Sequence, residues 1–386
     1  MEKKRLGDIC EIVTGATPKT NIKEFWDGDI NWITPAELTE DTYIINESLR
    51  KITTEGVEKT GLKSFPKGTV ILSSRAPIGK VAIAGYEMYC NQGFKNLICS
   101  KQINNRFLYW YLKGHKEYLN SLGRGATFKE ISKEIVENIE ICLPTLEKQK
   151  KYADILEQCN GIIQIKKGQL RKLETLVKSR FAEMFGDIGT GIFNFGTCKL
   201  GDVARVGSSH RVFTTEFVES GIPFYRGTEI GELANGQKPS EPYCISEEHY
   251  ERLANDDTKP LIGDLLMPSI CNKGQVWMVD TEEPFYYKDG RVLCISPDRR
   301  VFNSKFLQYF MREKTLVEYP KMGSGSTFAE FKIFLLKNMD VLIPPREIQE
   351  QFAAFVHQVD KSKSKIQKSL EETQLLFDSL MQKYFG

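Results

Sequence analysis

The sequence has no hydrophobic run long enough to cross a membrane, and no apolar stretch follows the charged start, Met1 to Gly7. A membrane-spanning helix needs ~18 or more consecutive apolar residues, and a secretory signal needs an apolar core of ~7 to 15 residues. We therefore expect a protein that is neither secreted nor membrane-spanning.

Cysteine and histidine pairs at metal-binding or redox spacing are also absent. The nine cysteines are dispersed without any C-x-x-C, and the four histidines are not paired at ligand spacing. An odd number of scattered cysteines, most of them in apolar runs such as the one around Cys142, indicates reduced core thiols in a cytoplasmic protein. We predict that the chain binds no metal, because this pattern gives a zinc site little support.

The sequence has almost no net charge. Its 53 Lys and Arg residues face 51 Asp and Glu residues, so the formal charge is only +2. Any argument for nucleic-acid binding must therefore come from the local placement of basic residues. The length of 386 residues, with 41% hydrophobic residues, excludes a disordered chain and predicts two or three domains.

An internal repeat organises the chain instead. The segment Gly123 to Glu130 returns two hundred positions later as Gly323 to Glu330, and Phe185-Gly186 returns as Phe385-Gly386. Weaker matches at the same or a slightly smaller offset are Leu143-Pro144 with Ile343-Pro344, Glu147 and Gln149 with Glu347 and Gln349, and Leu6-Gly7-Asp8 with Leu200-Gly201-Asp202. Each copy therefore has a divergent front and a more faithful back.

The back of each copy is predicted to be one long helix, because apolar residues recur there at alternating steps of four and three. The predicted seam holds Leu156, Ile163, Leu170, Leu173 and Val177 in the first copy, and Val356, Val359, Ile366, Leu370, Phe377 and Leu380 in the second. Like seams on two helices are buried most simply against each other, and the path of the chain makes that pairing antiparallel. Gly161 and Gly168 interrupt the first helix off the seam, either because a partner approaches closely or because the helix tolerates them.

The fronts mix short β-rich runs with helices, which predicts an α+β fold. Expected strands are 69–73, 80–84, 95–99, 275–279 and 291–295, and expected helices are 106–112 and 305–311. The resulting division is a first front at 1–145, a helix at 146–186, a linker and second front at 187–344, and a helix at 345–386. Within it, 186–201 is the expected linker.

The repeated glycine-rich segment has a second feature. Thr127 with Glu130, and Thr327 with Glu330, match the capping box, which predicts that a helix begins at each threonine. A glycine-rich loop that leads into a helix N-terminus also suits a DNA phosphate. The cap alone and a cap that also contacts phosphate both remain open; Arg124 favours the contact in the first copy.

Catalytic motifs are scarce. The sequence contains no P-loop, no Asn/Asp-Pro-Pro-aromatic methyltransferase motif, no Gly-x-Ser-x-Gly and no His-Glu-x-x-His. Asp298, Glu330 and Lys332 resemble a PD-ExK nuclease pattern, but the first copy has no such set and Glu330 already fits the capping box. A non-catalytic protein is therefore the main interpretation, and a stand-alone PD-ExK-like endonuclease is its alternative.

Polar and basic residues on turns of the two fronts are the candidate DNA contacts. Arg and Lys suit phosphates and guanine edges, whereas Asn and Gln suit adenine. The candidates are Thr17, Lys19, Ser74, Arg75, Lys80, Gln92, Lys95, Arg124 and Thr127 in the first copy, and His210, Arg211, Arg226, Asn272, Lys273, Lys288, Arg291, Ser324 and Thr327 in the second. The alternative for each of them is a solvated loop residue.

These features together resemble the DNA specificity subunit of type I restriction-modification systems. The resemblance covers the whole chain and rests on the Leu-Gly-Asp start of each copy, Ser74 to Gly79, the repeated Gly-x-Gly-x-Thr-Phe, and Leu143-Pro144 with Ile343-Pro344. The second copy departs at Met267 to Gly274, which lacks the Arg-Ala-Pro order.

The resemblance implies two target recognition domains held apart by an antiparallel coiled coil of the two helices. Each domain would read one half of a bipartite, asymmetric site in double-stranded DNA, while the helices set the spacing and dock two methyltransferase subunits. The chain itself would have no catalytic centre and bind no cofactor; S-adenosylmethionine, ATP and Mg²⁺ would act in the methyltransferase subunits and in restriction subunits. A scaffolding coiled-coil protein without DNA affinity is the remaining alternative.

Overall fold

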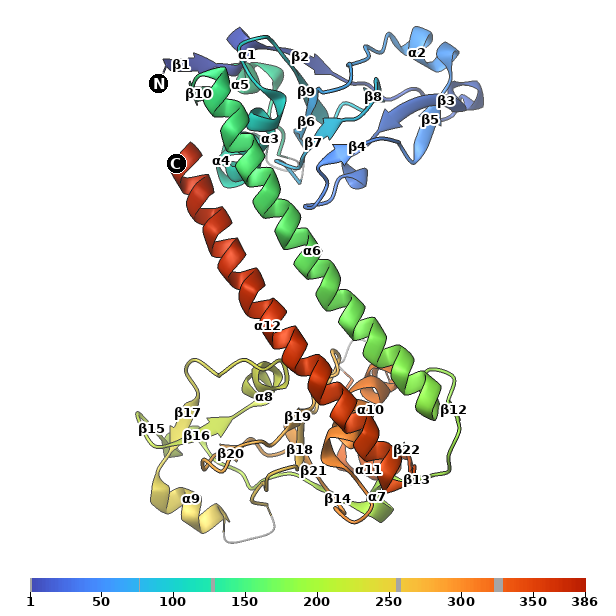
Figure 1. Ribbon diagram of the computed structural model, residues 1–386, viewed down its shortest axis with the longest axis vertical. Coiled ribbons are helices and arrows are strands. Elements are labelled where there is room, and N and C mark those ends of the chain that lie inside the picture. Colours follow the sequence, from blue (N-terminus) through green and yellow to red (C-terminus); the bar gives the residue numbers. More distant parts are fainter. Residues whose placement is uncertain (1, 76, 126–128, 255–257, 323–328) are drawn as a thin grey trace. The chain divides into compact units, whose positions relative to one another are not determined.

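A computed structural model describes residues 2–75, 77–125, 129–254, 258–322 and 329–386 (Figure 1). The chain forms two compact units. Unit 1 comprises Met1–Gly168 and Gln367–Gly386, and unit 2 comprises Gln169–Ile366. Among the described residues, no helix combines the length and the apolar character that a membrane crossing requires.

Unit 1 contains two main sheets. The larger has the strand order β2 (Cys10–Thr14), β9 (Phe94–Cys99), β6 (Val70–Ser73), β7 (Val81–Ala84) and β4 (Ile44–Ile45), and the smaller has the order β5 (Arg50–Ile52), β3 (Trp26–Ile33) and β8 (Tyr89–Cys90). A further pair joins β1 (Glu2–Arg5) to β10 (Glu140–Leu143). The helices are α1 (Leu6–Ile9), α2 (Thr54–Thr60), α3 (Asn105–Gly114), α4 (Lys116–Ser121) and α5 (Lys133–Glu137), with 3-10 turns η1 (Lys23–Phe25) and η2 (Pro35–Glu37). The central strands β6 and β7 are buried throughout, which their β-branched and apolar residues favour.

Unit 2 repeats this plan with different details. One four-stranded sheet has the order β14 (Ala204–Gly207), β21 (Val292–Pro297), β18 (Leu265–Pro268) and β19 (Trp277–Met278), and the other has the order β15 (Phe217–Val218), β17 (Tyr243–Ile245), β16 (Ile222–Tyr225) and β20 (Tyr286–Tyr287). Two small pairs are β11 (Gly186–Asp187) with β12 (Ile192–Phe193), and β13 (Thr197–Lys199) with β22 (Asp340–Leu342). The helices are α7 (Leu200–Val203), α8 (Gly227–Ala234), α9 (Glu247–Ala254), α10 (Ser304–Glu318) and α11 (Ile333–Lys337), with 3-10 turns η3 (Thr214–Glu216) and η4 (Tyr319–Met322). The stretch expected as a linker therefore contains β11 to β13 and the start of α7.

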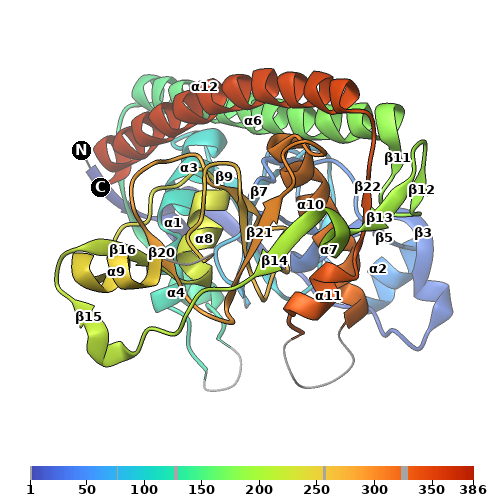
Figure 2. The same ribbon diagram turned by 90° about the horizontal axis from the view of Figure 1, so that it is seen from below.

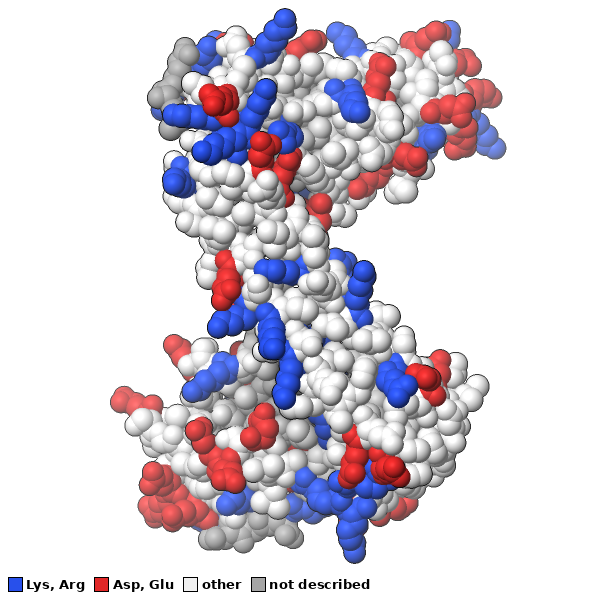
Figure 3. Space-filling view, in the orientation of Figure 1, with Lys and Arg blue, Asp and Glu red and all other residues white. Residues whose placement is uncertain are grey.

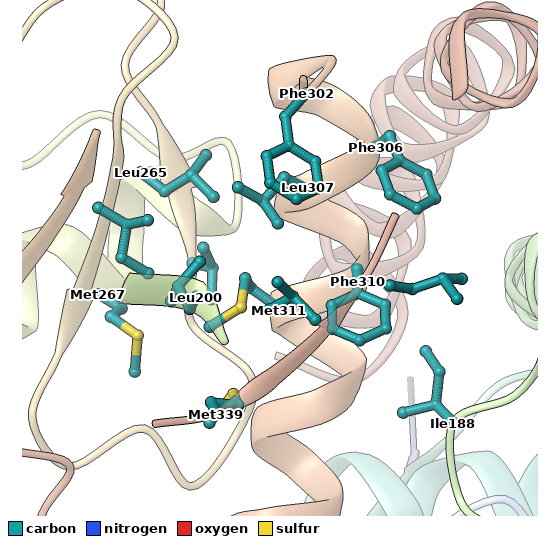
Figure 4. Close-up of a cluster of buried hydrophobic side chains, with 14 of the residues drawn as sticks. Ile188, Leu200, Leu265, Met267, Phe302, Phe306, Leu307, Phe310, Met311 and Met339 are labelled. Atoms are coloured by element: carbon teal, nitrogen blue, oxygen red, sulfur yellow. The ribbon is translucent and has the colours of Figure 1, made fainter. Parts of the chain in front are cut away.

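The core of unit 2 forms where α10 packs on the sheet that contains β18 and β21. Phe306, Phe310 and Met311 of α10 are fully buried and lie in one cluster with Leu265 and Met267 of β18 (Figure 4). In unit 1, α3 buries six consecutive side chains, from Phe107 to Leu112, in the corresponding place. Both helices are N-capped by an asparagine whose side chain accepts from two backbone N–H groups, Asn104 before α3 and Asn303 before α10.

A buried glutamine joins the front to the long helix in each unit. Gln149 is fully buried; its Oε1 accepts from the backbone N of Asn104 at 2.8 Å, and its Nε2 donates to the carbonyls of Gln102 and Pro144. Gln349 makes the equivalent bonds to Asn303, Val301 and Pro344. Three satisfied hydrogen bonds on a buried amide explain the repeat of glutamine at this position of both copies.

The long helices are α6 (Leu146–Phe185) and α12 (Arg346–Phe385), and each contributes one stretch to each unit. In unit 1 the ring of Tyr152, near the start of α6, stacks on that of Tyr384, near the end of α12, with centroids 4.0 Å apart. In unit 2 the ring of Phe181 meets that of Phe352 at 5.5 Å. The start of one helix thus lies beside the end of the other, so the predicted antiparallel pairing and the α+β class are confirmed (Figures 1 and 2).

The seam residues fall into two groups. Leu156, Ile163, Val177, Val356 and Val359 are buried, whereas Leu170, Leu173, Ile366, Leu370, Phe377 and Leu380 are partly buried. Near the helix ends the seam packs on the fronts as well as on the paired helix, as where the ring of Phe377 lies 5.6 Å from that of Trp110 in α3. In the middle, Lys166 Nζ donates to the carbonyl and Oγ of Ser369 and to Oγ1 of Thr373. A Cβ added at Gly161 or Gly168 would meet nothing within 4 Å, so within the described chain these glycines are tolerated and not required.

The capping-box prediction is wrong. Thr127 and Thr327 lie outside the described residues, but Glu130 and Glu330 precede the helices, which begin only at Lys133 and Ile333. In unit 1 Ser132 is the N-cap and accepts from the backbone N of Ile135. The cause is the use of Glu130 elsewhere, since its backbone pairs with Arg124 and its carboxylate binds two basic side chains.

Candidate nucleic-acid interface

In unit 1 the described contact candidates other than Lys95, which lies in β9, are on loops that meet at one end of the larger sheet. Thr17 Oγ1 donates to Gln92 Oε1 at 2.5 Å, and the backbone N of Ser74 donates to the carbonyl of Gly93 at 2.8 Å. The carbonyl of Ser74 in turn accepts from the backbone N of Ile131 at 2.9 Å. We call the described residues of 15–20, 34–38, 73–80, 91–95 and 123–131 the first loop cluster. It brings together segments that lie more than a hundred positions apart in the sequence.

The centre of the first loop cluster is a carboxylate between two cations. Arg75 Nε donates to Glu130 Oε2 at 2.9 Å, and Lys95 Nζ donates to Glu130 Oε1 at 3.2 Å and to Ser74 Oγ at 3.1 Å. Lys95 is only 5% exposed, whereas the Arg75 side chain is 45% exposed. Lys95 therefore binds the carboxylate from the buried side, and the guanidinium of Arg75 lies at the surface.

The charge state of this centre follows from its hydrogen bonds. Burial acts to raise the pKa of Glu130, but the bonds from Arg75 and Lys95 outweigh it, so that the pKa lies below its usual value. Glu130 is thus ionised at neutral pH, and the three side chains together keep one net positive charge. Of the two cations, Arg75 is the exposed one.

The remaining basic residues of the first loop cluster differ in availability. Lys80 Nζ donates to the carbonyls of Pro35 and Leu38 at 3.3 and 2.6 Å, so it fastens the loop at η2. Arg124 and Lys19 are exposed; the backbone of Arg124 exchanges two hydrogen bonds with Glu130, at 3.0 and 2.9 Å, which fixes its position.

Unit 2 builds the same backbone frame around Ser269. The backbone N of Ser269 donates to the carbonyl of Arg291 at 2.9 Å, and its carbonyl accepts from the backbone N of Phe331 at 2.7 Å. Here the side chain of Arg291 itself forms the ion pair with Glu330. The glutamate is therefore matched in both units, but the cation comes from a different position of the frame.

The other predicted residues of unit 2 lie around the same frame. Lys288 donates its backbone N to the carbonyl of Tyr225 at 2.9 Å, which places it beside Arg226. The backbone N of His210 donates to the hydroxyl of Tyr286 at 3.1 Å, and Arg211 lies with its guanidinium 5.5 Å from the ring centre of Phe213. Asn272 and Lys273 are exposed on the loop after β18. We call the described residues of 207–211, 225–229, 268–274, 288–292 and 329–331 the second loop cluster. Ser324 and Thr327, like Thr127, lie outside the described residues.

Arg226 is held more firmly than the sequence suggested. Its Nε and Nη2 both donate to the carboxylate of Glu229, with Nη2 2.5 Å from Oε1, and its guanidinium carbon lies 4.5 Å from the ring centre of Tyr243. Sequence analysis missed the roles of Glu229 and Tyr243. The Arg-x-x-Glu spacing could have revealed the first, because i and i+3 residues are neighbours at the start of a helix; nothing local links Tyr243 to Arg226.

Sequence analysis also missed an aromatic and basic cluster on the smaller sheet of unit 1. The guanidinium of Arg50 lies 3.7 Å from the ring centre of Trp26, and the rings of Trp26 and Trp32 meet edge to face at 5.1 Å. The Arg50 side chain thus covers an indole face, which stabilises this small sheet.

The geometry contradicts the nuclease alternative. Asp298 directly follows β21 and binds Arg300, whereas Glu330 binds Arg291, which directly precedes β21. A strand rises ~3.3 Å per residue, so the two carboxylates lie at opposite ends of a six-residue strand and cannot share a metal ion. Within the part of the chain that the structure describes, no group of three or more His, Cys, Asp or Glu side chains could hold a metal ion.

Surface charge is mixed. On the face that Figure 3 shows, acidic and basic side chains are interspersed over both units. On this face the small net charge of the sequence corresponds to a mixed surface. In the two loop clusters, Arg75 and Arg291 are each exposed and paired with a glutamate.

Comparison with known proteins agrees with these features. The family described as type I restriction modification DNA specificity domain matches residues 1–175 and 194–373. A specificity subunit of the type I restriction enzyme MjaIX from Methanocaldococcus jannaschii is 30% identical, over 98% of this chain and 91% of that protein. The MjaVIII specificity subunit of the same organism is 23% identical over 95% of this chain and 89% of that protein.

Two solved structures share the fold. The S subunit of a type I restriction-modification system from M. genitalium has a TM-score of 0.57 and 15% identity, over 100% of this chain and 96% of that chain. A chain from a structural study of the assembly of a type I restriction-modification system has a TM-score of 0.56 and 18% identity, over 100% of this chain and 97% of that chain.

Proposed function

The chain belongs to the type I restriction-modification DNA specificity family, and from this premise we propose how its two loop clusters divide the reading of DNA. It is a DNA sequence-recognition subunit. The first loop cluster reads one half of a bipartite, asymmetric site in double-stranded DNA, and the second loop cluster reads the other half.

The observation that carries this proposal is the repeated frame with unlike side chains. Ser74 and Ser269 make matching backbone bonds, and Glu130 and Glu330 each bind an exposed arginine. A shared backbone frame would position both clusters in the same way against a duplex, whereas different side chains on that frame would contact different bases. A homologous but divergent pair of this kind suits an asymmetric site.

Individual residues take two roles in this proposal. Arg124 is exposed, and among the described residues only backbone bonds fix it, so it suits a phosphate. Arg75 and Arg291 are each tied to a glutamate, which limits their rotamers and suits a base edge. Thr17, Lys19, Gln92, His210, Arg211, Asn272, Lys273 and Lys288 remain candidate contacts around them, whereas Lys95 and Lys80 act inside the protein.

The helices α6 and α12 are proposed to set the spacing between half-sites and to dock two methyltransferase subunits. Their exposed large apolar side chains in unit 1 include Ile162, Ile165, Leu375 and Leu376, each at least 44% accessible. Exposed apolar side chains on a paired helix support docking of a partner protein. S-adenosylmethionine, ATP and Mg²⁺ are assigned to the methyltransferase and restriction subunits, and the cytoplasmic location stays a prediction.

Half-site exchange tests the proposal. The full chain is co-produced with its methyltransferase subunits, and methylated positions are mapped in the host DNA. Replacing residues 194–344 by the corresponding front of another family member should change one half-site and leave the other as it was. A change in both half-sites, or in neither, would contradict the division of labour. The chain alone with Mg²⁺ and plasmid should leave the plasmid intact; cleavage would revive the endonuclease alternative.

A further inference from the structure

Arg226, in the second loop cluster, is held by the carboxylate of Glu229 and the ring of Tyr243. It follows β16 directly and precedes α8, and its side chain is 37% exposed. Its partner Glu229 is only 6% exposed at the side chain and also accepts from the backbone N of Arg226 at 2.8 Å. Burial acts to raise the pKa of Glu229, but the hydrogen bonds from Arg226 outweigh this effect, so the pKa lies below its usual value. The carboxylate is therefore charged and binds the arginine as an ion pair.

The geometry of this pair leaves one edge of the guanidinium unused by the carboxylate. Guanidinium is a rigid planar fork with five N–H donors. Glu229 takes the edge formed by Nε and Nη2, so the edge formed by Nη1 and the second hydrogen of Nη2 points away from it. The ring of Tyr243 lies against the guanidinium plane and restricts its rotation. The edge that Glu229 does not take is therefore held in one orientation by Glu229 and Tyr243.

A fixed, paired arginine suits a base better than a phosphate. The Arg226 and Glu229 side chains together carry no net charge, so their attraction to the DNA backbone is weak. Two parallel N–H donors in a fixed plane, in contrast, match O6 and N7 of guanine in the major groove, the commonest specific contact of arginine.

Unit 1 has the same cradle without the arginine. The parallel pairing of β3 with β8 aligns Ile33 with Cys90, and that of β16 with β20 aligns Tyr225 with Tyr287, so Thr34 is the counterpart of Arg226. The backbone N of Thr34 donates to Glu37 Oε1 at 2.7 Å, just as that of Arg226 donates to Glu229. The Thr34 hydroxyl donates to the same carboxylate oxygen at 3.1 Å, and this side chain is shorter than that of an arginine.

We infer that Arg226 reads a guanine in the half-site contacted by unit 2, with Glu229 and Tyr243 as positioning residues, and that unit 1 lacks this contact because Thr34 takes the place of the arginine. The inference rests on the proposed function and goes further, since it names one base and the residue that selects it.

Selection from a duplex library with a fully randomised site tests the inference. The full chain, assembled with its methyltransferase subunits, is compared with Arg226→Thr, Arg226→Lys and Glu229→Gln, and bound duplexes are sequenced. Arg226→Thr should remove the preference for guanine at one position of one half-site, a loss of roughly 5- to 150-fold in discrimination, while the other half-site is unchanged. Arg226→Lys keeps the charge without the fork and should relax the same position, and Glu229→Gln should relax it less.

Arg300→Thr is the matched control. Arg300 also pairs with a nearby carboxylate, Asp298, but it lies beyond the far end of β21 and is 90% exposed. It should leave the selected sequence unchanged. If Arg226→Thr lowers the melting temperature by more than a few degrees, Arg226→Lys and Glu229→Gln decide in its place. An unchanged guanine in all Arg226 variants, or an equal weakening for all duplexes, would overturn the inference. Failure of the proposed function would look different, because the parent chain would then select no bipartite site.

Discussion

The two units use the same residues to hold their fronts on the long helices, and they differ in the loop clusters that we propose contact DNA. Gln149 and Gln349 fasten the fronts to the long helices through equivalent bonds, and Ser74 and Ser269 connect equivalent loops. By contrast, the position after β3 in unit 1 holds Thr34, whereas the equivalent position after β16 in unit 2 holds Arg226. The shared positions are buried and hold the backbone, whereas the differing ones are more exposed, which separates residues that build the frame from the residues that we propose select a sequence.

The same comparison explains why one unit has a buried lysine and the other does not. The β6 to β9 register pairs Leu72 with Lys95, and the equivalent β18 to β21 register pairs Met267 with Leu293. Unit 1 therefore supports its glutamate with a lysine from inside the sheet, and unit 2 supports Glu330 with Arg291 from the loop. The exposed guanidinium that pairs with the glutamate therefore belongs to Arg75, after β6, in unit 1 and to Arg291, before β21, in unit 2.

The largest expected effect lies in the shared frame. Gln149→Leu removes three hydrogen bonds from a fully buried site and leaves a backbone N–H and two carbonyls without that partner, so the free energy of unfolding should fall by about 3 to 5 kcal/mol. Gln349→Leu should cost a similar amount in unit 2. Denaturant melts of both variants check this. Gln367→Leu, on the exposed face of α12, should change stability by less than about 0.5 kcal/mol. If one of the two buried variants were as mild as Gln367→Leu, the frames would not be equivalent.

The next effect separates the two glutamate sites. Lys95→Met takes away the buried partner of Glu130 and should cost about 2 to 3 kcal/mol, whereas Arg291→Met acts on an exposed pair and should cost about 1 kcal/mol or less.

The cost of Lys95→Met should depend on pH. The pKa of Glu130 is lowered in the folded protein, so its contribution is present above the unfolded value of about 4.5 and is lost as the pH falls through the lower folded value. The difference between parent and Lys95→Met should therefore shrink in acid. Denaturant melts between pH 7 and pH 3 measure it, and a difference that grows in acid would refute the assignment.

Arg75 and Arg124 distinguish readout from positioning within unit 1. Arg75→Ala should cost about 1 to 3 kcal/mol on the preferred site and relax one base position. Arg124→Ala should weaken binding to all sequences alike and reduce the slope of affinity against salt by about one phosphate contact. Gel shifts at several salt concentrations decide this; a salt slope identical to that of the parent removes Arg124 from the phosphate contacts.

The smallest effect concerns the helices. Gly161→Ala and Gly168→Ala should each raise stability by about 0.5 to 1 kcal/mol, because alanine favours the helix and its Cβ would have no described atom beyond the adjacent helix backbone within 4 Å. The counterparts in the second helix are Lys361 and Lys368. Thermal melts of the chain alone check this prediction. Gly79→Ala, at φ +90° and close to Lys116, should destabilise instead.

Predictions that rested on periodic or repeated residues, such as the two long helices, are confirmed. The prediction of helix starts at the capping boxes is wrong, because it depended on which partner the glutamate carboxylate binds. The spacing of apolar residues gave both long helices to within a residue or two. The capping boxes failed because a threonine and a glutamate at the right spacing define a helix start only if the glutamate is free, and Glu130 is bound to Arg75 and Lys95. Lys95 was predicted as a DNA contact because a sequence does not show which face of a buried strand a lysine occupies.

The repeat, the α+β class, the antiparallel helices and the family could all be predicted from the amino-acid sequence, because they follow from periodicity and from residues matched along the chain. Which basic side chains are tied to partners inside the protein and which are exposed became clear only from the folded structure. Hydrogen bonds and ion pairs join positions far apart in sequence, such as Arg75 with Glu130 and Arg226 with Tyr243. Their geometry depends on strand register, and register is fixed by packing over the whole domain.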